Sequence, residues 1–516
     1  MDTRPNFVCI VTDQHRADHL GCAGNPVLRT PSLDRLAAEG VRFERAFVNN
    51  PLCMPARATF FTGRTPRGHG VRTNGIPLDY SVPTMTESLR QAGYRTHAVG
   101  KIHLRPFGTP NGLPAEALNP QEFPESRALW DSGQVQTMPQ PYYGLERVEF
   151  VGGHGSWMWG DYVTWLREQR ADGFDLLQPQ AGTKTPHNAE QSWKSALPEE
   201  LHHSRWVADR AIDFLEGAAG EPKPFFLWCS FPDPHHPYCP PAPWSSMYDP
   251  EDVLLPKRRE GELGDLPPFF KEVYEKGIPL SGRFGPTRMP DEQLREILAL
   301  TYGMISLVDH HIGRILDALD AAGLRQNTVV MFMSDHGDLM GDHWLINKGP
   351  FHFDGLLNVP FIWSWPGQFQ SGRASAALAS HLDFAPTVLA LAGVGIPEGP
   401  VPQKAEAPQA PPAWPGLSLA PLLRGEADSV REAVLVENDE DYLGLRLRTL
   451  ITDRYQLTVY SGESYGELFD LDADPAQVHN LWASPAHRTL RDSLEDWLLH
   501  ELMLTDSPLP RRLCHA

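Results

Sequence analysis

The chain has 516 residues and a formal net charge of -20 at pH 7. This length is sufficient to bury a large core, either in two domains or in one large domain with a smaller one attached. The acidic balance argues against general electrostatic binding to nucleic acid or to an anionic membrane, although it allows a local basic pocket for a small anion.

The first residues and the cysteines predict where the protein is located. The chain enters an apolar run at residues 7–11 without the charged leader, long apolar region and cleavage site of a signal peptide. No later segment has the roughly 20 uninterrupted apolar residues that span a bilayer. The six cysteines lack the spacing of a zinc site and the density of a disulfide scaffold. We expect a cytoplasmic protein with no membrane or nucleic-acid partner, and a homo-oligomer is compatible with the sequence.

Short β-branched and aromatic runs alternate with helical stretches through most of the chain. The expected strands are residues 7–11, 225–231, 328–333 and 359–363, and the expected helices are residues 30–39, 84–92, 203–215 and 297–321. Apolar runs of this length suit strands buried on both faces. The alternation predicts an α/β fold with a large mixed or mostly parallel sheet sandwiched by helices. In such folds catalytic groups emerge at the carboxyl ends of strands.

Three segments interrupt this alternation. Residues 105–198 are rich in Pro, Gly, Gln and Trp and predict long surface loops with short helices, as a lid or substrate wall. Residues 256–290 form a second irregular region, and the Pro- and Ala-rich residues 397–415 predict an extended linker. We therefore predict a catalytic domain over residues 1–396, a linker region over 397–430 and a C-terminal α+β subdomain over 431–516.

The last part of the chain has a different pattern. Four short strand-like runs, at residues 433–437, 447–452, 455–460 and 467–471, are separated by turn residues and followed by a helical stretch at 488–499. This pattern predicts a small antiparallel sheet with a terminal helix packed on it.

Two of the expected strands end in residues that can bind a cation. The first run continues into Asp13 and Gln14, and the run at 328–333 continues into Asp335 and His336. Carboxylate and amide oxygens are ligands for hard cations, and neighbouring strand ends would bring these side chains together. A carboxylate at such a place could equally cap a turn. Two acids further along the second loop are alternatives to Asp335, namely Asp338 and Asp342.

Cys53 precedes a segment that predicts the start of a helix. Pro55 suits the first helical turn and Gly63 the C-terminal cap. The thiol would then lie at a helix N-terminus, where the dipole and unpaired N–H groups favour an anion. Taken alone, a single cysteine more often packs as a small hydrophobe. Arg57, one turn further on, could form an ordinary surface ion pair.

In order and spacing, these motifs resemble the signature of type I sulfatases in the alkaline phosphatase superfamily. The resemblance rests first on Cys53-x-Pro55-x-Arg57 with Thr62-Gly63-Arg64. It continues through the segments Gly100-Lys101-Ile102-His103, residues 234–238, residues 334–337, Asn347-Lys348-Gly349 and residues 467–471. It implies an alkaline phosphatase-like fold and conversion of Cys53 to formylglycine by a formylglycine-generating enzyme.

The resemblance also implies a role for each motif residue. One divalent cation, Ca²⁺ by first expectation or Mn²⁺ as the alternative, would be held by Asp13, Gln14, Asp335, His336 and the modified Cys53. Arg57 and Lys101 would orient the formylglycine and the sulfate. His103 would act on the formylglycine hydroxyl, and His235 with Lys348 would serve the ester oxygen and the leaving group. The implied function is hydrolysis of a small-molecule sulfate monoester to an alcohol and sulfate.

Some positions depart from the common sulfatase pattern. Gln14 stands where many sulfatases have a second acid, and His336 where many have asparagine. Both residues are more similar to those at the same places in choline sulfatases and phosphonate monoester hydrolases. The choice between Ca²⁺ and Mn²⁺ as the bound metal therefore stays open. Asn74, expected to contact the anion, lies in residues 70–75, which resemble that group as well.

Two alternative functions follow. One is a phosphonate monoester or phosphodiester hydrolase on the same fold, and the other is a catalytically silent binding or structural protein. Lys101 and His103 favour sulfate esters, because phosphonate hydrolases of this fold resemble the chain less at those two positions. The tryptophans Trp157 and Trp159 could stack on a sugar, cage a quaternary ammonium or simply pack.

Overall fold

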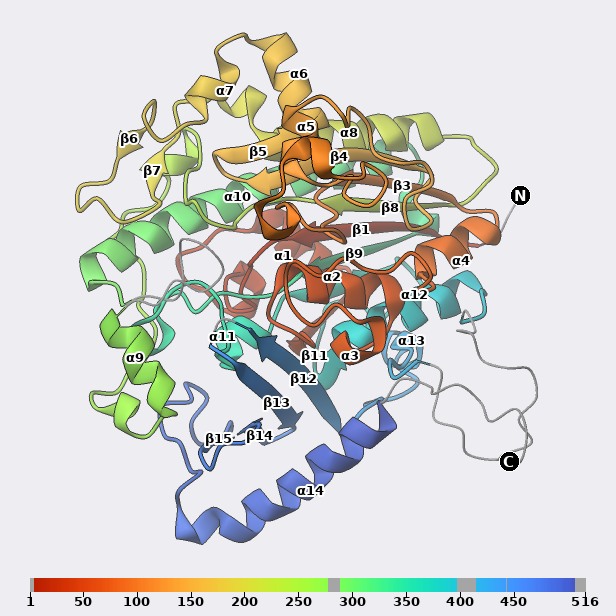
Figure 1. Cartoon of the computed structure of the whole chain (residues 1–516). Helices are drawn as coiled ribbons and strands as arrows, with labels where there is room; N and C mark the ends of the chain where they lie inside the picture. Colours follow the sequence, from red (N-terminus) through yellow and green to blue (C-terminus); the bar gives the residue numbers. More distant parts are fainter. Residues whose placement is uncertain (1–3, 277–287, 397–413, 442, 506–516) are drawn as a thin grey trace.

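The computed structural model describes residues 4–276, 288–396, 414–441 and 443–505. Within them a mixed nine-stranded sheet has the order β11-β2-β10-β9-β1-β8-β3-β4-β5 (Figure 1). Its strands are β1 (Asn6–Thr12), β2 (Val41–Phe47), β3 (Arg95–Gly100), β4 (Arg147–His154), β5 (Trp157–Gly160), β8 (Phe225–Ser230), β9 (Thr328–Ser334), β10 (Phe361–Ser364) and β11 (Arg373–Ser380). β1 pairs in parallel with β8 and β9, and β10 runs antiparallel to β9. The predicted large mixed sheet is confirmed.

Strand β1 shows why the central strands are continuous apolar runs. Successive side chains point to opposite faces of the sheet, and both faces are covered. Phe7 and Val11 pack in one core and Val8 and Ile10 in the other, all fully buried. The first core includes residues of α2 (Cys53–Thr62), α4 (Met85–Gln91) and α12 (Phe384–Ala392). The second includes residues of α1 (Pro31–Ala38), α8 (His203–Ala218) and α10 (Asp291–Ala321).

A separate antiparallel sheet forms the C-terminal part, drawn in blue in Figure 1. Its order is β12 (Ala433–Glu440), β13 (Leu445–Thr452), β14 (Tyr455–Tyr460) and β15 (Gly466–Asp470). Helix α14 (Arg488–Leu504) packs on it through Leu494 and Leu498. The predicted small sheet with a terminal helix is confirmed.

The predicted linker lies only partly within the described residues, because residues 397–413 are outside them. In the remainder, α13 (Ala420–Arg424) places Leu422 and Leu423 in the same core as α2 and α12. The boundaries at residues 396 and 430 stay a prediction.

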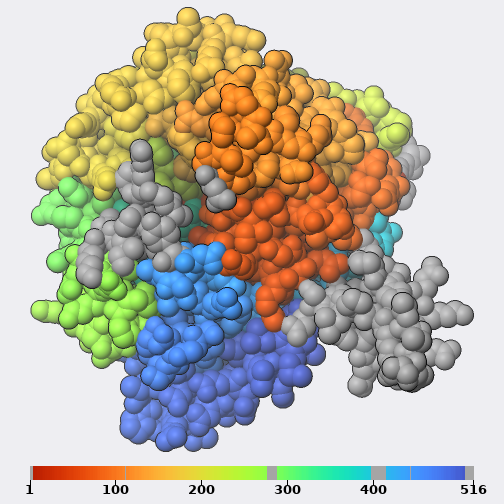
Figure 2. Space-filling view, viewed as in Figure 1, coloured from red at the N-terminus to blue at the C-terminus, as the bar shows by residue number. Residues whose placement is uncertain are grey.

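The segment of residues 105–198 contains more regular structure than the predicted loops. β4 and β5 form an antiparallel pair that extends the main sheet beyond β3, and α6 (Asp161–Gln169) follows. Glycines conceal these strands, because glycine has low strand propensity. Gly152 is needed there, since a Cβ would lie 2.3 Å from the Trp159 ring. In Figure 2 this segment, orange to yellow, forms the upper part of the visible face.

The remaining elements are short. They are α3 (Pro66–His69), α5 (Arg127–Asp131), α7 (Gly173–Leu176), β6 (Thr183–Lys184), β7 (Trp193–Lys194), α9 (Pro268–Lys276) and α11 (Asp354–Leu357). The irregular region at 256–290 contains α9, and its residues 277–287 lie outside the described part. In the ranges given above, none of the helices is long and apolar enough to cross a membrane.

Candidate active site

The two cation-binding motifs meet at the carboxyl ends of β1 and β9. These strands are parallel and in register, with Thr12 opposite Ser334, so the residues that follow each strand emerge side by side. The N-terminus of α2 faces the same point. The side chains whose ligand atoms all lie within 4.8 Å of one another, and which are all buried, are Asp13, Cys53, Asp335 and His336. The predicted convergence of the strand ends is therefore present.

Gln14 turns the chain after β1. Its φ of 65° is in the left-handed region, and its backbone N–H donates to Asp335 Oδ1 at 3.1 Å. Its side-chain amide nitrogen donates to Asp338, whose other oxygen accepts two backbone N–H bonds from its own loop. Asp342 instead pairs with Arg16 at 2.7 Å. Of the three acids after β9, Asp335 is thus the one that lies in the cluster with Cys53.

Two cationic side chains are bonded to the carboxylates. Arg57 donates to Asp335 Oδ2 at 2.8 Å and to Asp13 Oδ2 at 3.3 Å, and Lys101 Nζ donates to Asp13. Burial would raise the pKa of Asp13, but Lys101 and Arg57 outweigh burial and hold that pKa well below its usual range. Arg57 is 0% exposed, so the alternative of a surface ion pair is wrong.

Lys348 adds a third cation, in direct contact with Cys53. Its Nζ lies 3.1 Å from Cys53 Sγ, 3.0 Å from Gln14 Oε1 and 2.9 Å from His235 Nε2. Burial lowers the pKa of His235, and His154 and Lys348 lower it further, so this imidazole is neutral. Three cations around two carboxylates give the pocket a positive excess, which suits an anionic group.

The helix that starts at Cys53 forms as predicted. α2 runs over Cys53–Thr62, and Gly63, with φ 61°, caps its end. Burial and Asp13 raise the pKa of the Cys53 thiol, but Lys101 and Lys348 outweigh them and lower it overall. Asn74 accepts a hydrogen bond from the backbone N–H of Met54 at 3.0 Å. Its side chain therefore fixes the first turn of α2 beside the nucleophile position.

His103 lies in the loop after β3, in the left-handed region with φ 58°. Its ring stacks on Phe107 at 3.6 Å between centroids, and its Nδ1 is buried without a hydrogen-bond partner among the described residues. Burial lowers the pKa of His103, with Lys101 and Arg57 lowering it further, so the ring is a neutral base.

Glu125 was missed by sequence reasoning, and it holds this loop. Its carboxylate accepts the backbone N–H groups of His103, Leu104 and Arg105 and the hydroxyl of Tyr142. No sequence pattern marks Glu125, because it lies in a segment without periodicity and acts on backbone groups.

His154 was also missed. It ends β4, and its ring stacks on that of His235 with centroids 3.6 Å apart. Had residues 147–154 been interpreted as a strand, the position of His154 at a strand end would have been the signal. The neighbouring Trp159 is buried, and Trp157 is 41% exposed with the Arg127 guanidinium over its ring at 5.7 Å. A cation already lies on Trp157, which argues against a quaternary ammonium cage there.

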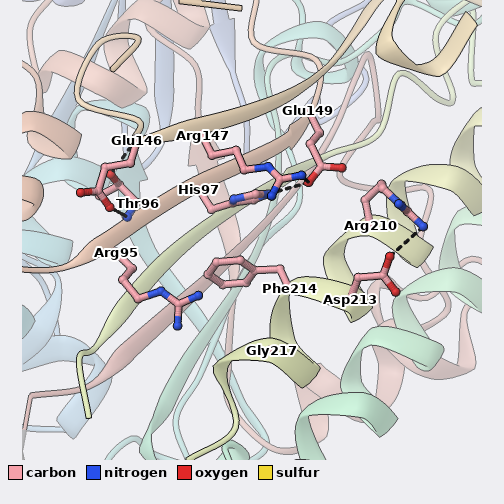
Figure 3. Close-up of a pocket in the computed structure, with 10 residues that line it drawn as sticks. All are labelled: Arg95, Thr96, His97, Glu146, Arg147, Glu149, Arg210, Asp213, Phe214 and Gly217. Atoms are coloured by element: carbon pink, nitrogen blue, oxygen red, sulfur yellow. Dashed lines mark hydrogen bonds and ion pairs between the residues drawn. The ribbon is translucent and has the colours of Figure 1, made fainter. Parts of the chain in front are cut away.

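A surface cavity of about 360 Å³ lies elsewhere on the sheet (Figure 3). It is at the amino ends of β3 and β4, whereas the cluster around Cys53 is at the carboxyl ends of the strands. Its charged side chains pair with each other, as in Arg210 with Asp213 at 2.7 Å and His97 with Glu149 at 3.3 Å. This cavity is separate from the candidate active site.

Two family models and several known proteins match this chain. The family model described as Sulfatase matches residues 5–394, and one described as N-sulphoglucosamine sulphohydrolase, C-terminal, matches residues 341–503. An arylsulfatase from Clostridium perfringens is 31% identical and covers 97% of this chain and 94% of its own length. A choline-sulfatase from Rhizobium meliloti is 27% identical, over 93% of this chain and 83% of that protein.

A solved structure shows the same fold. The phosphonate monoester hydrolase from Silicibacter pomeroyi has a TM-score of 0.79 with this chain at 23% identity, and the match covers 98% of this chain and 96% of that one. At this identity the likeness concerns the fold alone.

Proposed function

The chain belongs to the sulfatase family and is a sulfuric ester hydrolase, and we propose that its nucleophile is Cys53 after conversion to formylglycine. The substrate is a small organic sulfate monoester, which is cleaved to an alcohol and sulfate. The observation that carries the proposal is the position of Cys53 at the start of α2, inside a buried group of two carboxylates and three cations. Conversion requires a formylglycine-generating enzyme as a maturation partner, and that enzyme must supply the oxidant.

The surroundings of Cys53 suit such a group. A hydrated formylglycine supplies two hydroxyls on one carbon, one to attack sulfur and one whose deprotonation releases sulfate. Lys348 Nζ, at 3.1 Å from Cys53 Sγ, is positioned to bond to an oxygen atom there. Arg57 and Lys101 stabilise negative charge on the sulfate oxygens.

Two residues of the chain, Lys348 and His103, transfer protons in this proposal. Lys348 donates a proton to the alcohol oxygen as it leaves. The neutral His235 accepts a hydrogen bond from Lys348 Nζ at 2.9 Å and orients the ammonium, and solvent returns the proton to Lys348 after turnover. His103, a neutral buried imidazole, takes the proton whose removal completes the cycle. Glu125 keeps His103 in place through the backbone of its loop.

The residues present also fit one divalent cation. Asp13, Asp335 and His336 would hold it together with the modified Cys53, and Gln14 would add its amide oxygen. When bound, such a cation lowers the pKa of a hydroxyl and offsets charge on substrate oxygens. Ca²⁺ remains the first expectation, while the imidazole of His336 supports Mn²⁺ as the alternative.

Sulfate is preferred over phosphonate in this proposal because of Lys101 and His103. A sulfate monoester carries one negative charge, and so does a phosphonate monoester, so charge alone does not separate them. What supports sulfate is the pair Lys101 and His103, because phosphonate hydrolases of this fold resemble the chain less at those two positions. The described cysteines are all free, which supports a proposed cytoplasmic location.

A substrate panel tests the proposal. Protein co-produced with the maturation enzyme should hydrolyse at least one aryl, choline or sugar sulfate with a higher kcat/KM than any phenyl phosphonate ester. The Cys53 peptide should show a mass loss of about 18 Da for replacement of CH2SH by an aldehyde. Cys53→Ala is the matched control and should be inactive. A higher kcat/KM for the phosphonate esters, or full activity in Cys53→Ala, would overturn the proposal.

A further inference from the structure

A second group of metal-ligating side chains lies apart from the Cys53 cluster. Asp233 follows β8, and His202 and His203 are at the start of α8. Their ligand atoms lie within 4.8 Å of one another, and the three side chains are buried. The mechanism proposed above uses none of them.

Two polar atoms in this group lack a hydrogen bond. In the part of the chain that the structure describes, His203 Nε2 and Asp233 Oδ1 are buried without a hydrogen-bond partner. They face each other at 3.5 Å. A hydrogen bond between them would measure about 2.7–3.2 Å. Two ligands at about 2.0–2.1 Å from a tetrahedral zinc lie about 3.4 Å apart, so the observed spacing matches a shared ion better than a direct bond.

The other contacts of the group orient it for a ligand. Ser204 Oγ donates to Asp233 Oδ2 at 2.6 Å, which fixes the carboxylate and leaves Oδ1 directed at His203. His202 Nδ1 lies 3.9 Å from Asp233 Oδ2. It accepts only a long bond of 3.3 Å from the Ser204 N–H, which a metal ion would replace.

We propose that Asp233, His202 and His203 bind a divalent transition-metal ion of the zinc type, with water as a further ligand. Two imidazoles and one carboxylate are donors that zinc takes in proteins, whereas calcium takes oxygen ligands. The ion therefore differs in class from the cation expected at the Cys53 cluster if that cation is Ca²⁺. All its protein ligands are buried, as in a structural site.

The ion would connect helix α8 to two parts of the catalytic machinery, the loop of His235 and the strand end at Asp13. Asp233 is two residues before His235, and its carbonyl accepts the backbone N–H of Asp13 at 3.2 Å. His202 and His203 belong to the first turn of α8. A metal ion held among them fixes the loop that carries His235 against that helix, and binding energy of this kind appears as folding stability.

Zinc content and thermal stability test the site. Purified protein, stripped with a chelator and reloaded with Zn²⁺, should take up one equivalent more than His203→Asn by elemental analysis and show a higher Tm. His203→Asn should lose this zinc and the rise in Tm. Asp335→Asn should keep both, because it alters only the Cys53 cluster. His311→Gln is the matched control, since it changes a buried histidine that pairs with Glu199 at 3.1 Å outside the group.

Cobalt provides a second readout if His203→Asn fails to fold. Asp335→Asn loaded with Co²⁺ should show the intense visible bands of a tetrahedral site with nitrogen ligands, and the double variant Asp335→Asn/His202→Gln should not. Zinc uptake that is the same in His203→Asn and wild type would overturn the proposal. So would a chelator-stripped wild type that neither binds Zn²⁺ nor gains Tm, which would assign the 3.5 Å gap to a water-mediated or direct Asp233–His203 interaction.

Discussion

The charged side chains around Cys53 are buried, and removing a charge from water costs free energy. Opposite charges within the site therefore have to offset one another. Arg57 is shared by Asp13 and Asp335, and Lys101 is bonded to Asp13. Lys348 differs from both, because among the described residues it forms no ion pair with a carboxylate. Its partners are Cys53 Sγ, an amide oxygen and two imidazoles. The Lys348 ammonium is therefore the cation best placed to give a proton to a leaving group.

This difference predicts a leaving-group dependence. Lys348→Ala should lower kcat/KM about 10²–10⁴-fold for alkyl sulfates, whose alkoxides need a proton, and far less for 4-nitrophenyl sulfate, whose phenolate leaves unaided. A plot of log kcat/KM against the pKa of the leaving alcohol should be steeper in the variant. Lys101→Ala is the control and should lower kcat/KM by a similar factor for every substrate. An equal loss for every substrate in Lys348→Ala would assign Lys348 to charge stabilisation only.

The second half of the reaction depends on His103. An asparagine tolerates the left-handed conformation at this position, where φ is 58°, so His103→Asn removes the base without straining the loop. We expect a burst of alcohol in the first turnover, followed by slow release of both products, because the proton that completes the cycle is no longer removed. Rapid-quench measurement of alcohol and sulfate separately shows this. Normal steady turnover in His103→Asn would mean that another group is the base.

At the scale of elements, the sequence predicted those parts that depend on local pattern. β1 and β9 are apolar runs ending in acids, and parallel neighbours in register necessarily bring Asp13 and Asp335 together. The helix start at Cys53 followed from Pro55 and Gly63. Motif order then supplied His103, His235 and Lys348. Lys348 contacts both Cys53 and His235, and the roles of all three residues stay predictions.

The parts that sequence reasoning missed depend on tertiary contacts. β4 contains Gly152, which is favourable only because the Trp159 ring lies against it, so strand propensity gave no signal and His154 was not placed. Glu125 acts on backbone N–H groups of a loop 20 or more residues away in the chain. Such contacts leave no periodicity, and a single sequence does not reveal them.

The C-terminal sheet contains a buried carboxyl that makes its stability depend on pH. Glu467 in β15 is fully buried, and its hydrogen bond from Tyr460 is 2.7 Å long. Burial raises the pKa of Glu467 from 4.5 to about 8. The folded pKa is above the unfolded one, so the stabilising contribution is complete below about pH 4.5 and is lost as pH rises through about 8.

Glu467→Gln should remove this pH dependence. The free energy of unfolding of wild type should fall relative to the variant by up to about 1.4 kcal/mol per pH unit within this window. Denaturant unfolding at a series of pH values measures the difference. Glu463→Gln, at an exposed glutamate of the same hairpin, is the control and should follow wild type. If the free energy of unfolding changes with pH in the same way in Glu467→Gln and in wild type, Glu467 is ionised in the folded protein.

On the scale of the whole molecule, the C-terminal sheet is tied to the loop that carries Cys53. Val434 and Val436 of β12 share a buried cluster with Phe47 at the end of β2. The Asn50 side chain donates to the carbonyl of Glu437 at 2.7 Å and accepts the N–H of Leu52 at 3.0 Å. Leu52 directly precedes Cys53, so the second sheet helps to set the position of the nucleophile.

This connection predicts that the two sheets unfold together, although the sequence suggested a linker between them. Calorimetry of the full chain should show one cooperative transition, because a separated main sheet would expose the apolar cluster around Phe47. It would also lose the hydrogen bond from the buried Asn49 amide to the Leu435 carbonyl at 2.8 Å, a contribution of about 0.5–1.5 kcal/mol. A chain that ends at residue 430 should be inactive and have a lower Tm or fail to fold. A chain that ends at residue 505 keeps every element of the second sheet and α14, and it should retain the activity and Tm of the full chain. Two resolved transitions, or a chain of residues 1–430 with normal kcat, would instead make the C-terminal sheet an independent domain with no part in positioning Cys53.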